Sequence, residues 1–418
     1  MAEREFDVVV FGSTGVTGRQ VAAYVAEQGA PWAAAARDAA KSEQVLGEIG
    51  VSAPETMVAD VSDPSSLEAM AARARVVLDL VGPYTLFGRP VIEACVANGA
   101  HYADLSGEIP FLRKIIDEYD ARARDAGVKV TQACGFEALP ADLAVLLAIE
   151  TARDRFGEAL DEAELEVSVT GERALPRPSE ILSGGTLQSL AAAVGLDNAD
   201  AVTDPSALIT DPARADQVRR RSPLKLIPRR GRGGAVVAPM APAAFINPPV
   251  IQRSAALLAA EGDGSVEPFV YREGVALGGG TATLPLRYAA AGVMAGTQAA
   301  VSGITRVGPS TRQRLGRTLS RILPSSGFGP KGEQLEGWHW RMSLEARTVE
   351  GQAVRVDIDA DGHPGYLTTA RMLGEAGLLL AEPGMTPERA GCLTPATALG
   401  TGAIDRFERA RMRFSVAP

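Results

Sequence analysis

The N-terminal segment carries three glycines spaced three residues apart, Gly12, Gly15 and Gly18. They follow the apolar run from Val8 to Phe11 and precede an amphipathic run from Arg19 to Gln28. Where a strand turns directly into a helix, Gly12 allows the tight turn, Gly15 lets a pyrophosphate approach, and Gly18 lets helix and strand pack closely. The free N–H groups and partial positive charge of the helix start favour phosphates. The pattern therefore predicts a dinucleotide-binding turn.

The residues between these glycines complete the candidate turn: Ser13, Thr14, Val16 and Thr17. The three hydroxyls among them can donate hydrogen bonds to phosphate oxygens. A second apolar run, Trp32 to Ala36, is followed by Arg37, where an NAD site usually has Asp or Glu. Because a guanidinium pairs well with a 2′-phosphate, the sequence favours NADPH over NADH. Asp38 follows directly and keeps NADH open as an alternative, and Arg37 could instead be a solvated loop charge.

Further candidate contacts lie where the predicted strands end. Apolar runs at Thr56 to Val58, Val76 to Val81 and Val128 to Cys134 alternate with helical stretches. This alternation predicts a parallel sheet that binds its ligand beyond the carboxyl ends of the strands. The residues at those ends are Asp60 near the adenine, Val81, Gly82 and Pro83 near the nicotinamide, and Cys134, Gly135 and Phe136 at the far rim. Asp60 could instead cap a helix, because Ser62-Asp63-Pro64 begins one just after it.

Tyr84 is our candidate for the residue that supplies a proton, because it follows the strand beside which the nicotinamide is expected. Tyr102 or a water molecule could do the same, and Tyr84 could instead pack beneath the nicotinamide ring. The tyrosine–lysine acid of short-chain dehydrogenases is missing, because no tyrosine has a lysine four residues later. The sequence also has neither a Walker loop nor a nucleophile elbow. The three histidines, His101, His339 and His363, lie far apart, and no cysteine pair has zinc spacing. We therefore expect no metal site.

Composition limits the partners and the compartment. The 418 residues carry a formal net charge of −9, which argues against nucleic acid as a partner, since backbone phosphates demand a basic face. Three cysteines, far apart and odd in number, fit a reducing cytoplasm better than a disulfide scaffold. The acidic N-terminus runs straight into the first apolar run and does not have the form of a signal peptide. We therefore expect a cytoplasmic protein.

Length and alternation predict an α/β protein, namely a Rossmann-type doubly wound parallel sheet with an inserted second α+β domain. We place the dinucleotide-binding domain at residues 1–145, a substrate or dimerisation domain at 146–365, and helices that return to the Rossmann domain at 366–418. Within the second domain, Ser183 to Thr186 could present helix N–H groups to a substrate or be a simple capping turn. Residues 338–348 and 352–360 predict a hairpin.

Two segments of the predicted second domain suggest contacts with partners. Seven basic residues and no acidic residue lie between Arg219 and Arg232, with Pro and Gly that disfavour a helix. We interpret this basic segment as either a solvated linker or a docking patch for an acidic carrier protein or an anionic membrane. Tyr288 to Ile304 holds no charged residue. Its alternatives are a buried, an interfacial or a membrane-spanning helix, although it is short and weakly apolar for a bilayer.

Together these motifs resemble the saccharopine dehydrogenase-like oxidoreductases, and among them the mycobacterial trans-acting enoyl reductases. The residues that carry the resemblance are Gly12-Ser-Thr-Gly-Val-Thr-Gly18, Val81-Gly-Pro-Tyr84 with Gly88 and Pro90, Ala94-Cys95, Tyr102-Ala-Asp-Leu-Ser-Gly-Glu108, Ala133-Cys-Gly-Phe136 with Pro140 and Asp142, Ser183-Gly-Gly185 and Leu393-Thr-Pro-Ala396. They cover nearly the whole chain. The sequence departs from the family at Ala36, where Gly is usual, and at Glu137-Ala138, where Asp-Ser is usual.

The resemblance implies an NADPH-dependent reductase that acts during the synthesis of cell-envelope lipids. Its implied substrate is an unsaturated acyl chain held as a thioester on the carrier of a polyketide synthase. On this hypothesis the β-carbon receives a hydride from NADPH and the α-carbon a proton from Tyr84 or water. A saccharopine-type amino-acid dehydrogenase and a non-catalytic NADP(H)-binding regulator are the alternatives. A peripheral membrane contact and a homodimer are further expectations.

Overall fold

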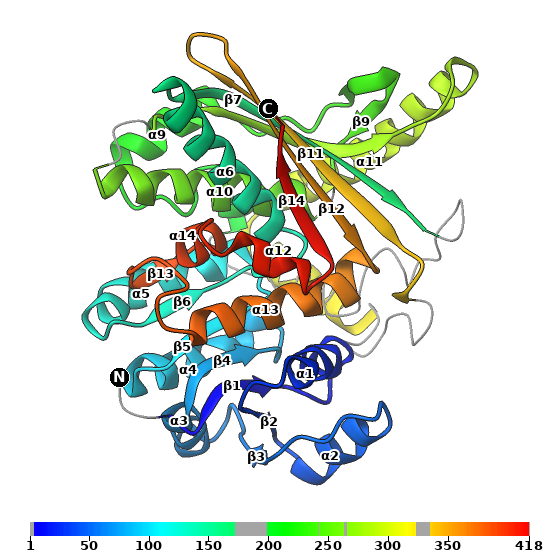
Figure 1. Ribbon diagram of the computed structural model, residues 1–418. Helices are drawn as coiled ribbons and strands as arrows, with labels where there is room; N and C mark the ends of the chain where they lie inside the picture. Colours follow the sequence, from blue (N-terminus) through cyan, green and yellow to red (C-terminus); the bar gives the residue numbers. More distant parts are fainter. Residues whose placement is uncertain (1–3, 172–198, 241, 263–265, 323–334, 418) are drawn as a thin grey trace.

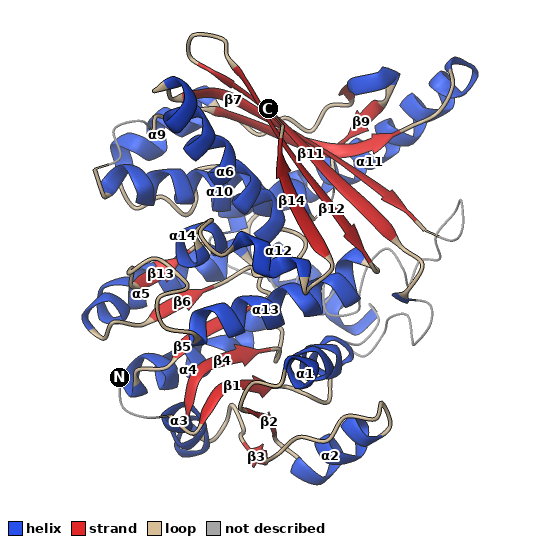
Figure 2. Ribbon diagram, in the orientation of Figure 1, coloured by secondary structure: helices blue, strands red, loops and turns tan. Residues whose placement is uncertain are grey.

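The computed structural model describes residues 4–171, 199–240, 242–262, 266–322 and 335–417. Two seven-stranded sheets organise this part of the chain, and Figure 1 shows them one above the other. Helices separate the two sheets and cover the lower one on both sides (Figure 2). The stretch from Ser183 to Thr186, for which we expect a helix start, lies outside the described residues.

The first sheet is entirely parallel, in the order β13-β6-β5-β4-β1-β2-β3. Its strands are β1 (Phe6–Phe11), β2 (Trp32–Ala36), β3 (Thr56–Val58), β4 (Ala74–Asp79), β5 (His101–Asp104), β6 (Lys129–Thr131) and β13 (Gly391–Leu393). Val8, Val9 and Val10 are completely buried, as expected of a strand covered on both faces. The strand order reverses between β1 and β4, so the ligand crevice of such a sheet is expected at the carboxyl ends of these two strands.

Two layers of helices enclose the first sheet. Their bounds are α1 (Val16–Gln28), α2 (Ala39–Gly47), α3 (Pro64–Arg73), α4 (Tyr84–Asn98), α5 (Ile109–Asp125), α6 (Leu139–Phe156), α13 (Thr369–Ala381) and α14 (Pro395–Leu399). Val8 and Val10 belong to the core that α1, α6 and α13 share, whereas Val9 and Phe11 belong to the core of α3, α4 and α5. The alternation of a strand thus divides one apolar run between two cores.

The second sheet is mixed, in the order β14-β12-β11-β7-β10-β9-β8, with β7 and β10 as its parallel pair. Its strands are β7 (Leu160–Thr170), β8 (Arg229–Arg230), β9 (Val236–Ala238), β10 (Val270–Leu277), β11 (His339–Thr348), β12 (Ala353–Asp361) and β14 (Met412–Val416). The predicted hairpin is β11 and β12, which alternate buried and exposed side chains. Trp340 and Met342 on the buried face pack in the same core as α6, which therefore joins the two sheets.

The remaining helical segments belong mostly to the second domain. They are η1 (Ala199–Thr203), α9 (Pro212–Arg221), η2 (Arg232–Gly234), α10 (Ala243–Ala260), η3 (Thr281–Thr283), α11 (Leu284–Thr305), α12 (Pro309–Ile322), η5 (Pro364–Thr368) and η6 (Ile404–Glu408). After β12 the chain returns to the first domain, where α13 packs on α1 and β13 pairs with β6. The second domain is therefore inserted into the first. The chain then passes back to the second sheet, where β14 pairs with β12, and this second passage between the domains was not predicted. The domain boundaries near residues 145 and 365 stay predictions.

The strands of the first sheet are shorter than the apolar runs suggest. β4 ends at Asp79 rather than Val81, and β6 ends at Thr131 rather than Cys134. The candidate contacts Val81 to Pro83 and Cys134 to Phe136 therefore lie in loops beyond the strands. The central strand β5 was missing from the predicted strands, because its four residues begin with His101 and end with Asp104 and so form no apolar run.

The structure corrects one expectation for the second domain and excludes one of the alternatives left open for another segment. The basic segment is not a helix-hostile loop throughout, because its first three arginines form the last turn of α9, before Pro223 interrupts the helix. The uncharged run Tyr288 to Ile304 is helical, but α11 is not buried, since its buried side chains form one narrow stripe. Among the described helices, none combines the length and the apolar character needed to cross a bilayer.

Candidate active site

The glycine turn lies at the carboxyl end of β1, as the sequence predicts, and the backbone conformation of Gly12 and the packing of Gly18 both require glycine. Gly12 adopts a positive φ of 92° and donates its N–H to the Ala35 carbonyl at 2.9 Å. A side chain at Gly18 would overlap the Gly12 carbonyl oxygen. Gly15 is exposed and begins α1 without any side-chain cap or acidic residue in the first turn. The Gly15 N–H donates to the Gly12 carbonyl at 3.1 Å, so the N–H groups left for a ligand are those of the first turn of α1, whose positive charge no acidic residue of that turn compensates. This arrangement suits a pyrophosphate.

The hydroxyl side chains of the glycine turn differ in how deeply they are buried. Ser13 is completely buried, and its Oγ lies 2.6 Å from the Oγ of Ser42 on α2. This hydroxyl therefore fastens the turn to α2 instead of facing a ligand. Thr14, Val16 and Thr17 are only partly buried, which leaves the hydroxyls of the two threonines as the candidates for contact with phosphate.

At the end of β2 the structure separates the two candidates for the ribose contact. Asp38 caps α2, where its Oδ1 accepts from the Lys41 N–H at 2.9 Å. Arg37 is exposed and follows β2 directly. Since Asp38 already satisfies a helix terminus, Arg37 is the side chain available to a 2′-phosphate.

Asp60 lies beyond β3, close enough to Arg37 for the two charges to interact. Its Oδ1 accepts from the N–H of Ser62 at 2.8 Å and from the Ser62 hydroxyl at 2.7 Å. These hydrogen bonds, and more weakly Arg37, lower the pKa of Asp60. The cap of α3 is Asp63, which accepts from the N–H of Ser65. Asp60 is therefore not used as the cap of this helix.

The loop after β4 packs against the glycine turn. The Val81 side chain would lie 3.0 Å from a Cβ placed on Gly12, and the Val81 N–H donates to Asp79 Oδ1 at 2.9 Å. Gly82 and Pro83 lead into α4. Tyr84 is buried, and its hydroxyl donates to the Asp79 carbonyl at 3.1 Å and accepts from the Leu105 N–H at 3.3 Å. Burial raises the pKa of this phenol well above its usual value. In this arrangement the Tyr84 hydroxyl joins the ends of β4 and β5.

A buried acid holds the loop at the far rim. Asp104 accepts from the N–H groups of Ser106 at 2.9 Å and Ala133 at 3.1 Å, and the Tyr102 hydroxyl donates to it at 2.8 Å. Burial raises the pKa of Asp104 to about 7. Ala133 has a positive φ of 62°, which costs about 1 kcal/mol for a residue with a Cβ. The hydrogen bond that the Ala133 N–H donates to Asp104 offsets that cost and fixes the start of the rim.

The rim residues connect the first domain to the second. Cys134 is buried, and burial raises the pKa of its thiol, so it is an inert packing residue. A Cβ on Gly135 would lie 3.2 Å from both Leu105 and Thr369. The Phe136 N–H donates to Thr369 Oγ1 at 3.1 Å, and its ring meets Trp340 of β11 edge to face at 5.0 Å. The far rim is therefore where the second sheet reaches the candidate site.

Two acidic residues near this edge were not predicted as site residues. Glu108 accepts from the N–H groups of Tyr84 at 3.0 Å and Thr85 at 2.8 Å, so its carboxylate occupies the start of α4. Glu137 lies beside Gly135, and burial raises the pKa of its carboxyl. Glu108 lies in a motif that carries the family resemblance and Glu137 at a position where the sequence departs from it, but the sequence gives no signal of these roles. Because Glu108 satisfies the start of α4, that helix offers no open site to a phosphate, whereas the start of α1 does.

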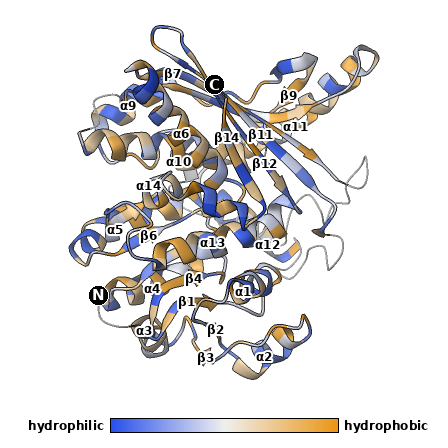
Figure 3. Cartoon of the chain, viewed as in Figure 1, coloured by the Kyte–Doolittle hydropathy of each residue, from blue (hydrophilic) through white to orange (hydrophobic). Residues whose placement is uncertain are grey.

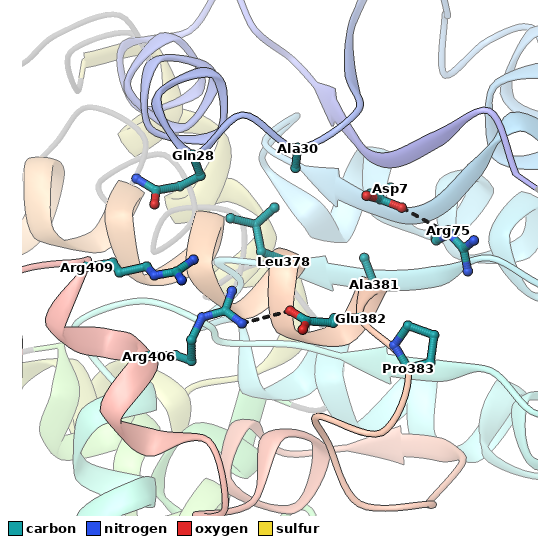
Figure 4. A pocket seen from close by; sticks show the side chains of 10 residues that line it. All are labelled: Asp7, Gln28, Ala30, Arg75, Leu378, Ala381, Glu382, Pro383, Arg406 and Arg409. Atoms are coloured by element: carbon teal, nitrogen blue, oxygen red, sulfur yellow. Dashed lines mark hydrogen bonds and ion pairs between the residues drawn. The ribbon is translucent and has the colours of Figure 1, made fainter.

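A hollow of about 310 Å³ lies at the opposite, amino edge of the first sheet, where β1 begins and α1 ends. Its lining residues are Asp7, Gln28, Ala30, Arg75, Leu378, Ala381, Glu382, Pro383, Arg406 and Arg409 (Figure 4). Arg75 pairs with Asp7 at 3.0 Å, and Arg406 pairs with Glu382 at 2.7 Å. No glycine turn or helix start faces this hollow, so it does not have the features of a dinucleotide site.

The basic segment is largely neutralised by acidic residues of its own domain. Arg219 pairs with Asp204 at 3.0 Å, Arg221 pairs with Asp161, and Arg229 pairs with Glu164. Arg232 pairs with Glu345 at 2.6 Å. These arginines hold the edge of the second sheet, which weakens the interpretation of the segment as a docking patch.

Comparison with known proteins agrees with this geometry. The family model described as the saccharopine dehydrogenase NADP binding domain matches residues 8–130. The trans-acting enoyl reductase of Mycobacterium tuberculosis is 35% identical over 428 residues, which cover 97% of this chain and 96% of that protein. The trans-acting enoyl reductase of Mycobacterium ulcerans is 33% identical over 423 residues, with the same coverage of both proteins.

A solved structure of similar extent is the apo saccharopine dehydrogenase (L-Glu forming) from Saccharomyces cerevisiae. It is 14% identical and has a TM-score of 0.49, with 98% of this chain and 99% of that chain covered. The matched NADP-binding domain contains the glycine turn and Arg37, the residues that the sequence predicts as contacts of NADPH. The chain is therefore an NADPH-using oxidoreductase and belongs to the saccharopine dehydrogenase-like family, together with the mycobacterial proteins named trans-acting enoyl reductases.

Proposed function

We propose that this protein reduces the carbon–carbon double bond of an enoyl thioester carried by a polyketide synthase. The observation that carries the proposal is the 33–35% identity, over nearly the whole of both chains, to proteins named trans-acting enoyl reductase. The bound dinucleotide would supply the hydride that the β-carbon receives. The α-carbon must then gain a proton.

The first domain provides the binding half of this chemistry. The amides of the first turn of α1, after Gly15, would hold the pyrophosphate, with the hydroxyls of Thr14 and Thr17 as further donors. Arg37 would pair with the 2′-phosphate and Asp60 would meet the adenosine side. The loop Val81 to Pro83 would border the nicotinamide, because it follows β4 at the topological switch point. The loop Cys134 to Phe136, which follows β6, would form the far rim of the same site.

The structure favours water as the source of the proton and Tyr84 as a positioning residue. The Tyr84 hydroxyl already donates to the Asp79 carbonyl, and its pKa is raised, so losing this proton would leave a buried phenolate. Its ring packs behind the loop that borders the nicotinamide side. Tyr84→Phe tests this role: we expect kcat to change less than about threefold, against a loss of 10²-fold or more for a general acid.

The experiment that tests the reaction is a stopped-flow measurement of NADPH absorbance after mixing with enoyl thioesters of several chain lengths. We expect absorbance loss that depends on the thioester, and mass spectrometry should find one saturated thioester for each NADPH consumed. The saturated thioester, which lacks the double bond, is the matched control substrate. If every chain length leaves NADPH unchanged, the proposal is wrong.

A saccharopine-type amino-acid dehydrogenase predicts a different result. That activity needs free arginines for two substrate carboxylates, whereas Arg229 and Arg232 of the basic segment are paired with glutamates. NADP⁺ reduction by amino-acid substrates, with no response to enoyl thioesters, would establish the dehydrogenase instead. A homodimer, a cytoplasmic location and a peripheral membrane contact also stay proposals, and the membrane contact has a defined surface, argued below.

A further inference from the structure

The helix α11 presents an apolar face to solvent. Its buried side chains form a narrow stripe, Arg287, Ala291, Gln298 and Thr305, spaced by multiples of a helical turn and packed toward β9 and η1. On the other side Leu286 is 72% exposed and Val293 is 69% exposed. Figure 3 shows α11 in hydrophobic colours where it extends beyond the second sheet. A helix packed to cover its apolar residues would show the reverse pattern.

Two buried arginines fix the position of this face. Arg287 donates to the carbonyls of Gly234 at 3.0 Å, Leu277 at 3.1 Å and Gly280 at 2.9 Å, which ties the start of α11 to the sheet. Arg312 on α12 donates to the carbonyls of Thr305 at 3.0 Å and Val307 at 2.9 Å, which ties α12 to the end of α11. We call α11 and α12 together, Leu284 to Ile322, the exposed hairpin. The apolar face is therefore held in place by specific hydrogen bonds.

The charges of this region have one sign. No acidic residue occurs between Glu273 and Glu333, although the whole chain carries a net charge of −9. Exposed arginines follow the apolar face at Arg306 and, on α12, at Arg314, Arg317 and Arg321. The surface thus combines apolar side chains with nearby cations, in a protein that an anionic surface would otherwise repel.

We propose that the exposed hairpin docks the protein on an anionic lipid surface. The apolar face of α11 lies in the interface between headgroups and acyl chains, and the arginines of α12 pair with lipid phosphates. This docking goes beyond the proposed reaction and does not depend on it.

Charge complementarity selects this occupant over others. A second copy docked through the same surface would bring like charges together, with no acidic residue in the hairpin to pair with them. An acidic carrier protein would match the arginines but would leave Leu286 and Val293 in water. An anionic bilayer satisfies both features at once.

The test is flotation of the full-length protein with vesicles, followed by the fraction bound. Vesicles of roughly three parts phosphatidylcholine to one part phosphatidylglycerol should bind the protein, pure phosphatidylcholine vesicles should bind it at least about tenfold more weakly, and added salt should release it. NADPH titration of each variant reports that it is folded.

Two variants address the two features separately. Leu286→Asn with Val293→Asn removes apolar side chains, and Arg306→Gln with Arg314→Gln and Arg321→Gln removes charge. Each set should lower binding to the anionic vesicles by at least about tenfold without changing NADPH affinity. The matched controls are Val349→Asn, at an exposed position in the β11–β12 turn, and Arg220→Gln, at an exposed position on α9.

The outcomes separate docking on lipid from its competitors. Absence of binding to anionic vesicles, or binding that both variants retain, overturns the proposal. If sedimentation shows a dimer that Leu286→Asn with Val293→Asn converts to a monomer, while wild type fails to float, the face is a self-association surface and lipid docking is wrong.

Discussion

The two edges of the first sheet differ in how their charges are satisfied. At the carboxyl edge the start of α1 has exposed amides, no cap and no acidic residue, and Arg37 stands nearby without an ion pair in the described part of the chain. At the amino edge there is a hollow of about 310 Å³ beside β1, but Arg75 and Arg406, which line it, are already paired with carboxylates. From this difference we expect the anionic cofactor at the carboxyl edge, because unsatisfied donors attract an anion and a hollow lined by paired charges does not.

The largest expected effect is at the carboxyl edge, with Gly18→Ala. Its Cβ would overlap the Gly12 carbonyl, so the turn must shift, and we expect NADPH affinity to fall about 100-fold, or about 3 kcal/mol. Fluorescence titration with NADPH measures this loss. Gly47→Ala is the matched control, because nothing lies within 4 Å of its Cβ, and it should leave affinity unchanged. If Gly18→Ala and Gly47→Ala bound NADPH with equal affinity, the glycine turn at the carboxyl edge would not be the cofactor site.

At the amino edge a substitution should cost stability instead of affinity. Arg406 lies 2.9 Å from the fully buried Glu375, to which Tyr24 donates at 2.5 Å. Arg406→Leu leaves that carboxylate without its cation, and we expect a loss of about 3 kcal/mol in the free energy of unfolding. Urea denaturation measures it. If NADPH affinity of the folded variant fell as well, the amino edge would take part in binding and the distinction would fail.

Arg37→Gln tests whether the carboxyl edge distinguishes NADPH from NADH. Loss of the charged contact should weaken NADPH binding about tenfold, or about 1.4 kcal/mol, and leave NADH binding unchanged, because only NADPH has the 2′-phosphate. Parallel titrations with both nucleotides measure the ratio. Arg409→Gln, an exposed arginine of the amino-edge hollow, is the control and should change neither affinity. If Arg409→Gln weakened NADPH binding and Arg37→Gln did not, the amino edge rather than the carboxyl edge would hold the 2′-phosphate.

The smallest effect concerns pH. Asp104 is buried with a pKa of about 7, above the ordinary value of 3.8, so the folded state binds more protons than the unfolded state between these values. Its contribution to stability is therefore present at low pH and is lost as pH rises from about 4 to about 7. Asp104→Asn should remove this decline, which urea unfolding across that pH range measures. An unchanged pH slope would show that Asp104 is ionised in the fold.

Much of the first domain could be predicted from the sequence, because its signals are local. The apolar run before Gly12 gives the strand, and the glycine spacing gives the turn and the helix. Trp32 to Ala36 is a strand with the predicted bounds. The features of this domain that were not predicted depend on tertiary contacts. The Ser13 hydroxyl turns inward only because Ser42 meets it, and His101 to Asp104 is a strand only because strands on both sides pair with it.

The second domain was harder to predict because its interactions connect distant residues. The basic segment reads as a free charge run, but Arg232 pairs with Glu345, more than a hundred residues away in the chain. The uncharged run of α11 reads as a core helix, since exposure cannot be read from apolar composition alone. The cofactor residues stay predictions, because their geometry fits a dinucleotide but no contact with one has been measured.

Hydrogen–deuterium exchange with and without NADPH tests most directly which edge binds the cofactor. The account predicts slower exchange in Gly12 to Gly18 and around Arg37, with no change in Leu378 to Glu382 or around Arg409. Protection confined to the segments around the amino-edge hollow, with none in the glycine turn, would contradict it.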